Sequence, residues 1–236
     1  MNEQPRREEI AAGLRTVRDR IAAAAQRVGR HPRDVTLVVV TKTFPASDIR
    51  LLAGLGVRDV GENRHPEAGE KAAALGDLDL CWHFVGHVQS NKAAKVASYA
   101  DVVHSVDSVR LAHRLGAGAE ATGRVVTCLV QVSLDPPSTG KGRGGAARGA
   151  AQDVAAAVAA TRGLQLGGVM GIAPQGEPPT GAFARLAEIA AQIRGLHPSA
   201  TMVSAGMSGD LAQAVGAGAT HVRVGSAVLG PRPPLR

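Results

Sequence analysis

A lysine stands at the end of a strongly apolar stretch in the first quarter of the chain. Residues 38–45 read VVVTKTFP, so that three valines and a threonine precede Lys42 and a proline follows three residues later. The sequence has 5 lysines and 22 arginines, and arginine therefore carries most of its positive charge. We interpret Lys42 as a residue required for its amine, the group that forms Schiff bases with carbonyl compounds.

Two segments rich in serine and glycine near the C-terminus predict a binding site for an anion. In SAGMSGD (204–210), Ser208 is expected to cap a helix and is followed by Gly209. In RVGSA (223–227), Gly225 and Ser226 follow an apolar stretch, where a missing side chain lets backbone N–H groups approach a ligand. Helix N-termini bind phosphate groups, so the two segments together predict a phosphate site.

Arg223 lies between two valines in the sequence HVRVG. In a strand, neighbouring side chains point to opposite faces, so Arg223 and the valines face different ways. Either Arg223 faces solvent and the valines are buried, or Arg223 faces the interior and needs hydrogen-bond partners there. The pattern alone leaves both orientations open.

Strand-like apolar segments alternate with helix-like segments along the chain, and these elements must position the reactive groups. A helix is expected over residues 5–28, where Ile10, Leu14 and Val17 recur at helical spacing. Continuously apolar runs such as VTLVVVT are typical of parallel strands that are buried on both faces. The expected strands are residues 35–41, 57–63, 81–86, 101–106, 123–133, 164–172, 201–206 and 220–230.

Eight strands that alternate with helices in 236 residues predict a single (β/α)₈ TIM barrel. The alternative is an open doubly wound sheet, which usually has fewer strands and commonly carries GxGxxG after the first one. This chain has neither feature. We therefore expect one domain over residues 1–236, with an extra N-terminal helix within residues 1–30 and a C-terminal tail at residues 231–236.

In a TIM barrel the functional groups lie at the C-terminal ends of the strands. This rule places Lys42, Asn63 of the sequence GEN and the two phosphate segments at one mouth. The combination leaves two chemistries open. One is pyridoxal 5′-phosphate (PLP) bound as a Schiff base on Lys42, and the other is a Schiff-base aldolase that acts on a phosphorylated sugar. Both use a lysine whose amine is kept uncharged by burial or by nearby cations.

A fifteen-residue stretch distinguishes these chemistries. WHFVGHVQSNKAAKV (82–96) closely resembles the signature of the pyridoxal phosphate homeostasis protein family, single-domain PLP-binding barrels related to the N-terminal domain of alanine racemase. VVVTKTFP, VGEN, GVMGIAP and SAGMSGDLAQAVGAGATHVRVGSAVLG are similar to further segments of that family, so the resemblance covers nearly the whole chain. Arg64 stands where the family often has an aromatic residue, and the loop DPPSTGKGRGG is longer and more basic than a minimal member requires.

The resemblance implies roles for seven residues. Lys42 would carry the Schiff base, and Asn63 would lie beside the cofactor. Arg223 would face the pyridine nitrogen. The residues that would hold or adjoin the phosphate are Met207, Ser208, Gly225 and Ser226.

The function implied by the resemblance is to hold PLP, to pass it to PLP-accepting apoenzymes and to keep the free aldehyde low, without catalytic turnover. An arginine donates hydrogen bonds and stays protonated, so it favours an unprotonated ring nitrogen and a poorer electron sink. An active amino-acid racemase is the first alternative. It needs a second base, and Tyr99, the only tyrosine, is expected at the opposite end of the barrel. His83 and His87 are the nearby substitutes, and we interpret His83 as a packed strand residue.

A basic, nucleic-acid-associated protein is the second alternative, because the formal net charge is +7 and the pI is about 10.2. The arginines are scattered, however, and aromatic residues make up only 2% of the chain, so we expect no nucleic-acid partner.

The N-terminus lacks the apolar segment of a secretory signal, and no apolar run is long enough for a membrane span. Cys81 and Cys128 are interpreted as buried free thiols without metal-binding spacing. We expect a cytoplasmic monomer with no membrane partner and no metal.

Overall fold

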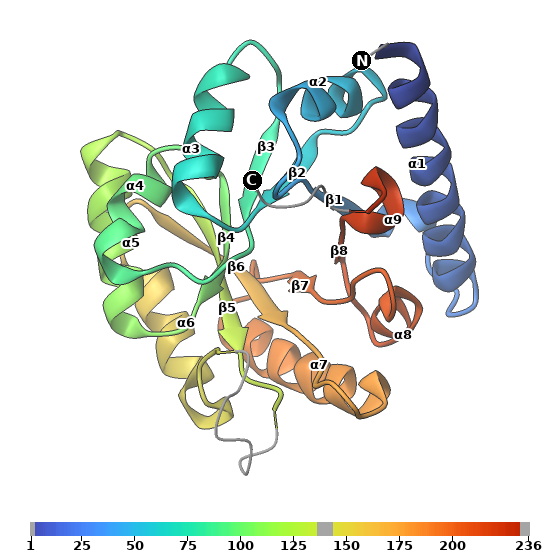
Figure 1. The fold of residues 1–236 in the computed structure, drawn as a ribbon. Helices are drawn as coiled ribbons and strands as arrows, with labels where there is room; N and C mark the ends of the chain where they lie inside the picture. The colour runs from blue at the N-terminus through green and yellow to red at the C-terminus, as the bar shows by residue number, and fades with distance from the viewer. Residues whose placement is uncertain (1–2, 136–143, 232–236) are drawn as a thin grey trace.

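The computed structural model describes residues 3–135 and 144–231, which form a closed barrel of eight parallel strands in sequential order (Figure 1). The predicted fold class is therefore confirmed. The strands are β1 (Thr36–Val40), β2 (Asp59–Glu62), β3 (Cys81–Phe84), β4 (Val102–Val106), β5 (Val126–Val132), β6 (Leu164–Gly171), β7 (Met202–Ser204) and β8 (His221–Val224).

Helices connect the strands and form the outer layer of the barrel (Figure 1). They are α1 (Glu3–Gln26), α2 (Ala46–Gly54), α3 (His65–Ala74), α4 (Ala93–Ala97), α5 (Val109–Ala121), α6 (Ala151–Ala160), α7 (Pro179–Leu196), α8 (Leu211–Gly216) and α9 (Ser226–Leu229), with 3₁₀ turns at η1 (Pro32–Asp34), η2 (Ser90–Lys92) and η3 (Arg148–Ala150). Within the described part of the chain, none of these helices has the length and apolar character needed to cross a membrane.

The extra N-terminal helix α1 packs its apolar stripe against the barrel. Ile10, Leu14 and Val17 are buried, as their helical spacing predicts, in one cluster with residues of α8 and α9. Gly13 lies on the same stripe, and a Cβ atom there would come within 2.4 Å of the Val228 carbonyl oxygen. A glycine inside a helix is unfavourable by itself, and this close approach to α9 is the reason for it.

The end of the chain differs from the prediction. Residues 220–230 were expected to form one long strand, but β8 ends at Val224 and residues from Ser226 onward form the short helix α9. Val228 and Leu229 of α9 are buried against α1. The alternating apolar pattern of so short a segment fits a strand and a helix equally well, and packing on a distant helix decides between them.

The inside of the barrel is only partly apolar. Val102, Leu129 and Met170 form a small interior cluster, whereas the larger clusters lie between the strands and the outer helices. Cys128 is buried in one of these outer clusters and Cys81 is half-buried; both are free thiols. Burial raises the pKa of Cys81 to about 12, which leaves it protonated at neutral pH. Polar residues fill much of the remaining interior, and they matter for the site.

Candidate functional site

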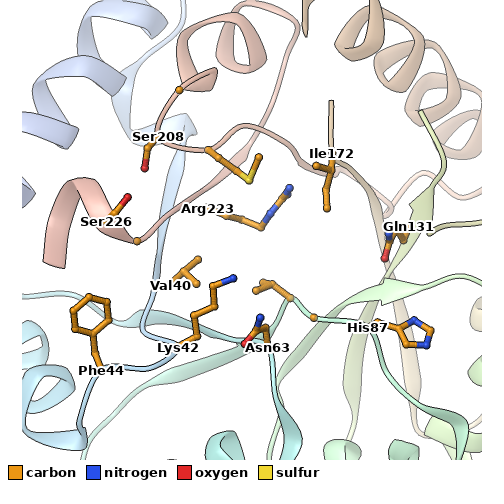
Figure 2. A pocket seen from close by; sticks show the side chains of 15 residues that line it. Val40, Lys42, Phe44, Asn63, His87, Gln131, Ile172, Ser208, Arg223 and Ser226 are labelled. Atoms are coloured by element: carbon orange, nitrogen blue, oxygen red, sulfur yellow. The ribbon is translucent and has the colours of Figure 1, made fainter. Parts of the chain in front are cut away.

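A cavity of about 490 Å³ opens at the C-terminal ends of the strands. All seven residues singled out from the sequence line it, and Figure 2 shows side chains from β1, β2 and the segments after β7 and β8 around one space. Their roles stay predictions, but their convergence is a property of the structure. The seven are Lys42, Asn63, Met207, Ser208, Arg223, Gly225 and Ser226.

Lys42 lies two residues after the end of β1, and its side chain extends into the cavity (Figure 2). The next residue, Thr43, has φ 69°, and among the described residues it is the one non-glycine with a positive φ. A β-branched residue is strained in this conformation, so the surrounding structure must maintain it. The Thr43 N–H donates a 2.7 Å hydrogen bond to Glu67 Oε1 of α3.

Four residues form a largely buried ionic group beside Lys42, which we call the Lys71 cluster: Thr41, Glu62, Glu67 and Lys71. Lys71 Nζ donates to Glu62 Oε1 at 2.7 Å, to Glu67 Oε1 at 2.6 Å and to the Thr41 carbonyl oxygen at 3.0 Å. The Thr41 hydroxyl donates to Glu62 Oε1 at 2.6 Å. The cluster therefore fixes the backbone on both sides of Lys42.

Burial and charge act in opposite directions on the two carboxylates of this cluster. Burial raises the pKa of Glu62 above its ordinary value, against the opposing effects of Lys71 and the Thr41 hydroxyl. Burial alone would also raise the pKa of Glu67, but hydrogen bonds from Lys71 and from the Thr43 N–H outweigh it and lower that pKa. Glu67 therefore stays ionised as a partner for Lys71.

Asn63 follows β2 and lines the cavity opposite Arg223 (Figure 2). Its Oδ1 atom is buried and has no hydrogen-bond partner among the described atoms. The backbone of Asn63 also contacts Gly86, where a Cβ atom would lie 2.2 Å from the Asn63 carbonyl oxygen. This close contact explains the glycine in the sequence WHFVG, because any larger residue would displace Asn63.

The two segments predicted to bind an anion lie side by side, and the Ser208 and Ser226 hydroxyl groups point toward one another (Figure 2). Gly225 must lack a side chain, because a Cβ atom would lie 2.9 Å from the Val40 carbonyl oxygen. The expectation that Ser208 caps a helix is wrong. The residue before α8 is Asp210, whose carboxylate accepts a 2.6 Å bond from the Met207 N–H and closes the turn.

The orientation of Arg223, which the sequence left open, is inward. Its side chain is buried, Nη1 donates to Ser204 Oγ at 2.6 Å, and Nη2 donates to the Gly171 carbonyl oxygen at 3.0 Å. Burial lowers the pKa of Arg223 to about 10, while Asp210 acts in the opposite direction. The guanidinium therefore stays charged at neutral pH and presents only hydrogen-bond donors to the cavity.

Of the three residues considered as second bases, two lie outside the cavity that Lys42 lines. His83 is buried inside the barrel, where it is hydrogen-bonded to Asp59 and His104, so its interpretation as a packed strand residue is confirmed. Tyr99 stacks on His65 with ring centroids 5.9 Å apart, and it is absent from the cavity lining. His87 alone of the three lines the cavity, with its side chain 70% exposed at the rim.

Several residues that build the site were not found from the sequence. Gln131 and Ile172 line the cavity from the ends of β5 and β6, and Phe44 lines it next to Lys42. Glu67 and Lys71 had a detectable signal, because they are four residues apart on an expected helix and can form an ion pair. Their link to Lys42 required the fold.

The described geometry can be compared with known proteins. Residues 14–233 match the alanine racemase N-terminal domain family. The pyridoxal phosphate homeostasis protein of Mycobacterium tuberculosis (strain H37Rv) is 41% identical, covering 96% of this chain and 94% of the relative. The protein of the same name from Escherichia coli (strain K12) is 37% identical, covering 95% and 97%. The chain belongs to the pyridoxal phosphate homeostasis protein family.

One of the solved structures similar to this chain was determined with PLP bound. PipY of Synechococcus elongatus PCC7942, determined with PLP bound, is 36% identical and superposes with a TM-score of 0.81, covering 94% of this chain and 100% of PipY. Membership of the pyridoxal phosphate homeostasis protein family agrees with the resemblance drawn from residues 82–96. The shared fold extends from α1 to β8, so the barrel and its mouth belong to the matched region.

Proposed function

We propose that this protein binds PLP as a Schiff base on Lys42 and serves PLP homeostasis by holding the cofactor and passing it to apoenzymes. The family membership and the PLP bound in PipY support the choice of ligand. The observation that carries the proposal is the shared cavity of about 490 Å³, which joins the Lys42 amine to paired serine and glycine turns.

The residues present fit PLP group by group. Lys42 would bind the aldehyde carbon, and the Ser208 and Ser226 hydroxyls with the backbone at Gly225 would hold the phosphate. Arg223 would donate to the pyridine nitrogen. Asn63 lines the same cavity, which supports a polar contact between its amide and the cofactor. When bound, PLP supplies an aldehyde and a ring that can accept electrons.

The same residues disfavour catalytic turnover. Arg223 is charged and donates only, so it would keep the ring nitrogen unprotonated and weaken the electron sink. Racemisation needs a proton acceptor on each face of the substrate carbon, and Lys42 can serve only one of them. The chain's only tyrosine, Tyr99, is stacked on His65 outside the cavity. We therefore propose a carrier function rather than an enzyme.

Titration of the purified protein with PLP, followed by absorbance, tests the proposal. A Schiff base absorbs in the near-ultraviolet to blue region, and Lys42→Ala should abolish this band. Lys95→Ala is the matched control, since Lys95 is exposed on α4 and is not part of the cavity. A band of equal intensity in Lys42→Ala would show that PLP binds elsewhere, and no band in the wild-type protein would refute the proposal itself.

A further inference from the structure

A chain of hydrogen bonds runs through the inside of the barrel, from its N-terminal end to the cavity. We call it the His83–His104 chain; from the cavity it links Arg223, Ser204, His104, His83 and Asp59. Arg223 Nη1 lies 2.6 Å from Ser204 Oγ, and Ser204 Oγ lies 2.9 Å from His104 Nδ1. His104 Nε2 lies 2.8 Å from His83 Nδ1, and His83 Nε2 lies 2.9 Å from Asp59 Oδ1.

With neutral imidazoles, the chemistry of the two end groups gives one consistent direction for the hydrogen bonds in this chain. Arginine can only donate, so Ser204 Oγ accepts from Arg223 and can give its own hydrogen to His104 Nδ1. A carboxylate can only accept, so His83 Nε2 carries a hydrogen and donates to Asp59. The other nitrogen of a neutral His83, Nδ1, accepts, so His104 Nε2 donates to it. In this arrangement all four ring nitrogens are bonded.

The burial of the chain shows that packing alone does not explain it. His104 and Ser204 are 0% exposed and His83 is 2% exposed. A buried polar group is unfavourable unless it is bonded, and an apolar side chain would fill the same space without that requirement. Leu129 and Met170 fill neighbouring parts of the interior in this way. The hydrogen-bonded polar residues instead lead to Arg223, which is buried and lines the cavity.

Asp59 marks the other end of the chain. It is the first residue of β2, and its side chain is 32% exposed. Ligand atoms of Asp59, Cys81 and His83 lie within 4.8 Å of one another, a spacing that a metal ion could use. His83 Nε2 is already bonded to Asp59, however, so the observed geometry is that of a hydrogen-bonded pair.

We propose that Ser204, His104, His83 and Asp59 are positioning residues for Arg223, which they hold in the one orientation that directs its remaining N–H groups into the cavity. Ser204 and the Gly171 carbonyl oxygen accept from two guanidinium nitrogens, and the imidazoles fix the Ser204 hydroxyl as an acceptor toward Arg223. The assignment of PLP as the ligand rests on the proposed function. The hydrogen-bonded chain itself does not, because its bonds join residues of the protein alone.

The first test uses the protein without cofactor. Two-bond ¹H–¹⁵N NMR spectra of the imidazoles report which ring nitrogen carries the hydrogen. His83 and His104 should both be neutral with the hydrogen on Nε2 at pH 7, and Asp59→Asn should shift the resonances of both. Asp101→Asn is the matched control, because Asp101 is 38% exposed, lies just before β4 and is outside the chain. A His104 hydrogen on Nδ1, or equal shifts in the two variants, would overturn the proposal.

The second test is a double-mutant cycle on PLP affinity. Ser204→Ala removes the hydrogen-bond acceptor of Arg223 and should weaken PLP binding by about 5- to 30-fold, the loss expected for an interaction of this strength. In the Arg223→Gln background the same change should have almost no effect, because the residue it positions is gone. An equal loss in both backgrounds would refute positioning while leaving PLP binding intact. Absence of PLP binding in the wild type would refute the proposed function and leave the NMR result standing.

Discussion

The two cationic residues that point into the cavity are supported in opposite ways. Lys42 lies on a backbone segment fixed by the Lys71 cluster, a charged group built from β2, α3 and the segment after β1. Arg223 is held by the His83–His104 chain, which lies inside the barrel and is neutral along most of its length. Lys42 is fixed through its backbone, with the strained Thr43 beside it, whereas Arg223 is fixed through its side chain.

This difference fits what each residue is proposed to do. A lysine that forms a Schiff base needs a fixed backbone, so that its amine reaches the aldehyde of the ligand. An arginine that donates to a ring nitrogen needs a fixed side chain. The charged cluster can be held together by strong ionic bonds because α3 supplies both Glu67 and Lys71. A chain of neutral imidazoles instead avoids burying several unpaired charges in the barrel interior.

The largest effect is expected from breaking the Lys71 cluster. Lys71→Met leaves the buried Glu62 without its cation, and loss of one partner of a buried ion pair costs about 3–5 kcal/mol. The free energy of unfolding, measured with urea, should fall by that amount, and PLP should bind more weakly. Arg50→Met is the control: the Arg50–Asp77 pair is exposed, and such pairs contribute at most about 1 kcal/mol. Equal losses in the two variants would contradict the importance of the cluster.

A substitution at Ser208 tests whether the phosphate of the ligand lies at the two serine and glycine segments, in the cavity that Lys42 and Arg223 line. Ser208→Asp adds a negative charge where the phosphate is proposed to lie, so PLP affinity should fall by about 1–3 kcal/mol, the scale of charged hydrogen bonds. Ser98→Asp is the control on an exposed loop residue outside the cavity. Wild-type affinity in Ser208→Asp would place the phosphate elsewhere.

The buried histidines inside the barrel and the Lys71 cluster should also lose their contributions to the free energy of unfolding in different pH ranges. Burial lowers the pKa of His104 well below its usual range and that of His221, beside His83, to about 4. The unfolded chain then binds more protons than the folded one between pH ~6.5 and 4. The free energy of unfolding therefore decreases as the pH is lowered through this range, by about 1.4 kcal/mol per pH unit for each histidine. Because the pKa of Glu67 is lowered, its contribution is present above the unfolded value of about 4.3 and is lost only at lower pH.

Urea unfolding at several pH values between 7 and 3 measures this separation. His221→Gln should reduce the slope of stability against pH by about one proton, with little change at pH 7. An unchanged slope would show that His221 is protonated in the folded state. A loss of stability confined to pH below 4.5 would assign the acid sensitivity to the Lys71 cluster instead.

The smallest expected effect is on amino-acid racemisation, which should not exceed that of free PLP. Lys42 faces a donor-only arginine across the cavity, and no tyrosine lines it. Loss of optical purity of L-alanine, incubated with PLP-loaded protein and with free PLP, is the measurement. Turnover near ~10 s⁻¹, typical of enzymes, would overturn the carrier proposal and make His87 at the rim the suspected second base.

The sequence predicted the barrel and seven of the residues that line the cavity, from local patterns and from the family resemblance. Apolar runs mark the strands, and the fold rule places Lys42 and Gly225 at one end. The resemblance of residues 82–96 then supplied the ligand. What was predicted is thus a list of residues at one place, without the contacts that orient them.

The supports could not be predicted because they depend on closure of the barrel. Asp59 and Arg223 are far apart in the sequence, and the His104–Ser204 bond crosses the barrel from β4 to β7. The helix α9 was taken as a strand for the same reason, since its packing partner is α1 at the other end of the chain. The cap of α8 was misassigned by two residues because Ser208, Gly209 and Asp210 all suit such a turn.

Reduction of the PLP-loaded protein with borohydride, followed by peptide mapping with mass spectrometry, tests the central claim most directly. Borohydride converts a Schiff base to a stable secondary amine, so the modified lysine is identified without relying on affinity or activity. The account predicts one modified site, Lys42, in the peptide that contains VVVTKTFP. Modification of a different lysine in place of Lys42, or none after saturation with PLP, would contradict it.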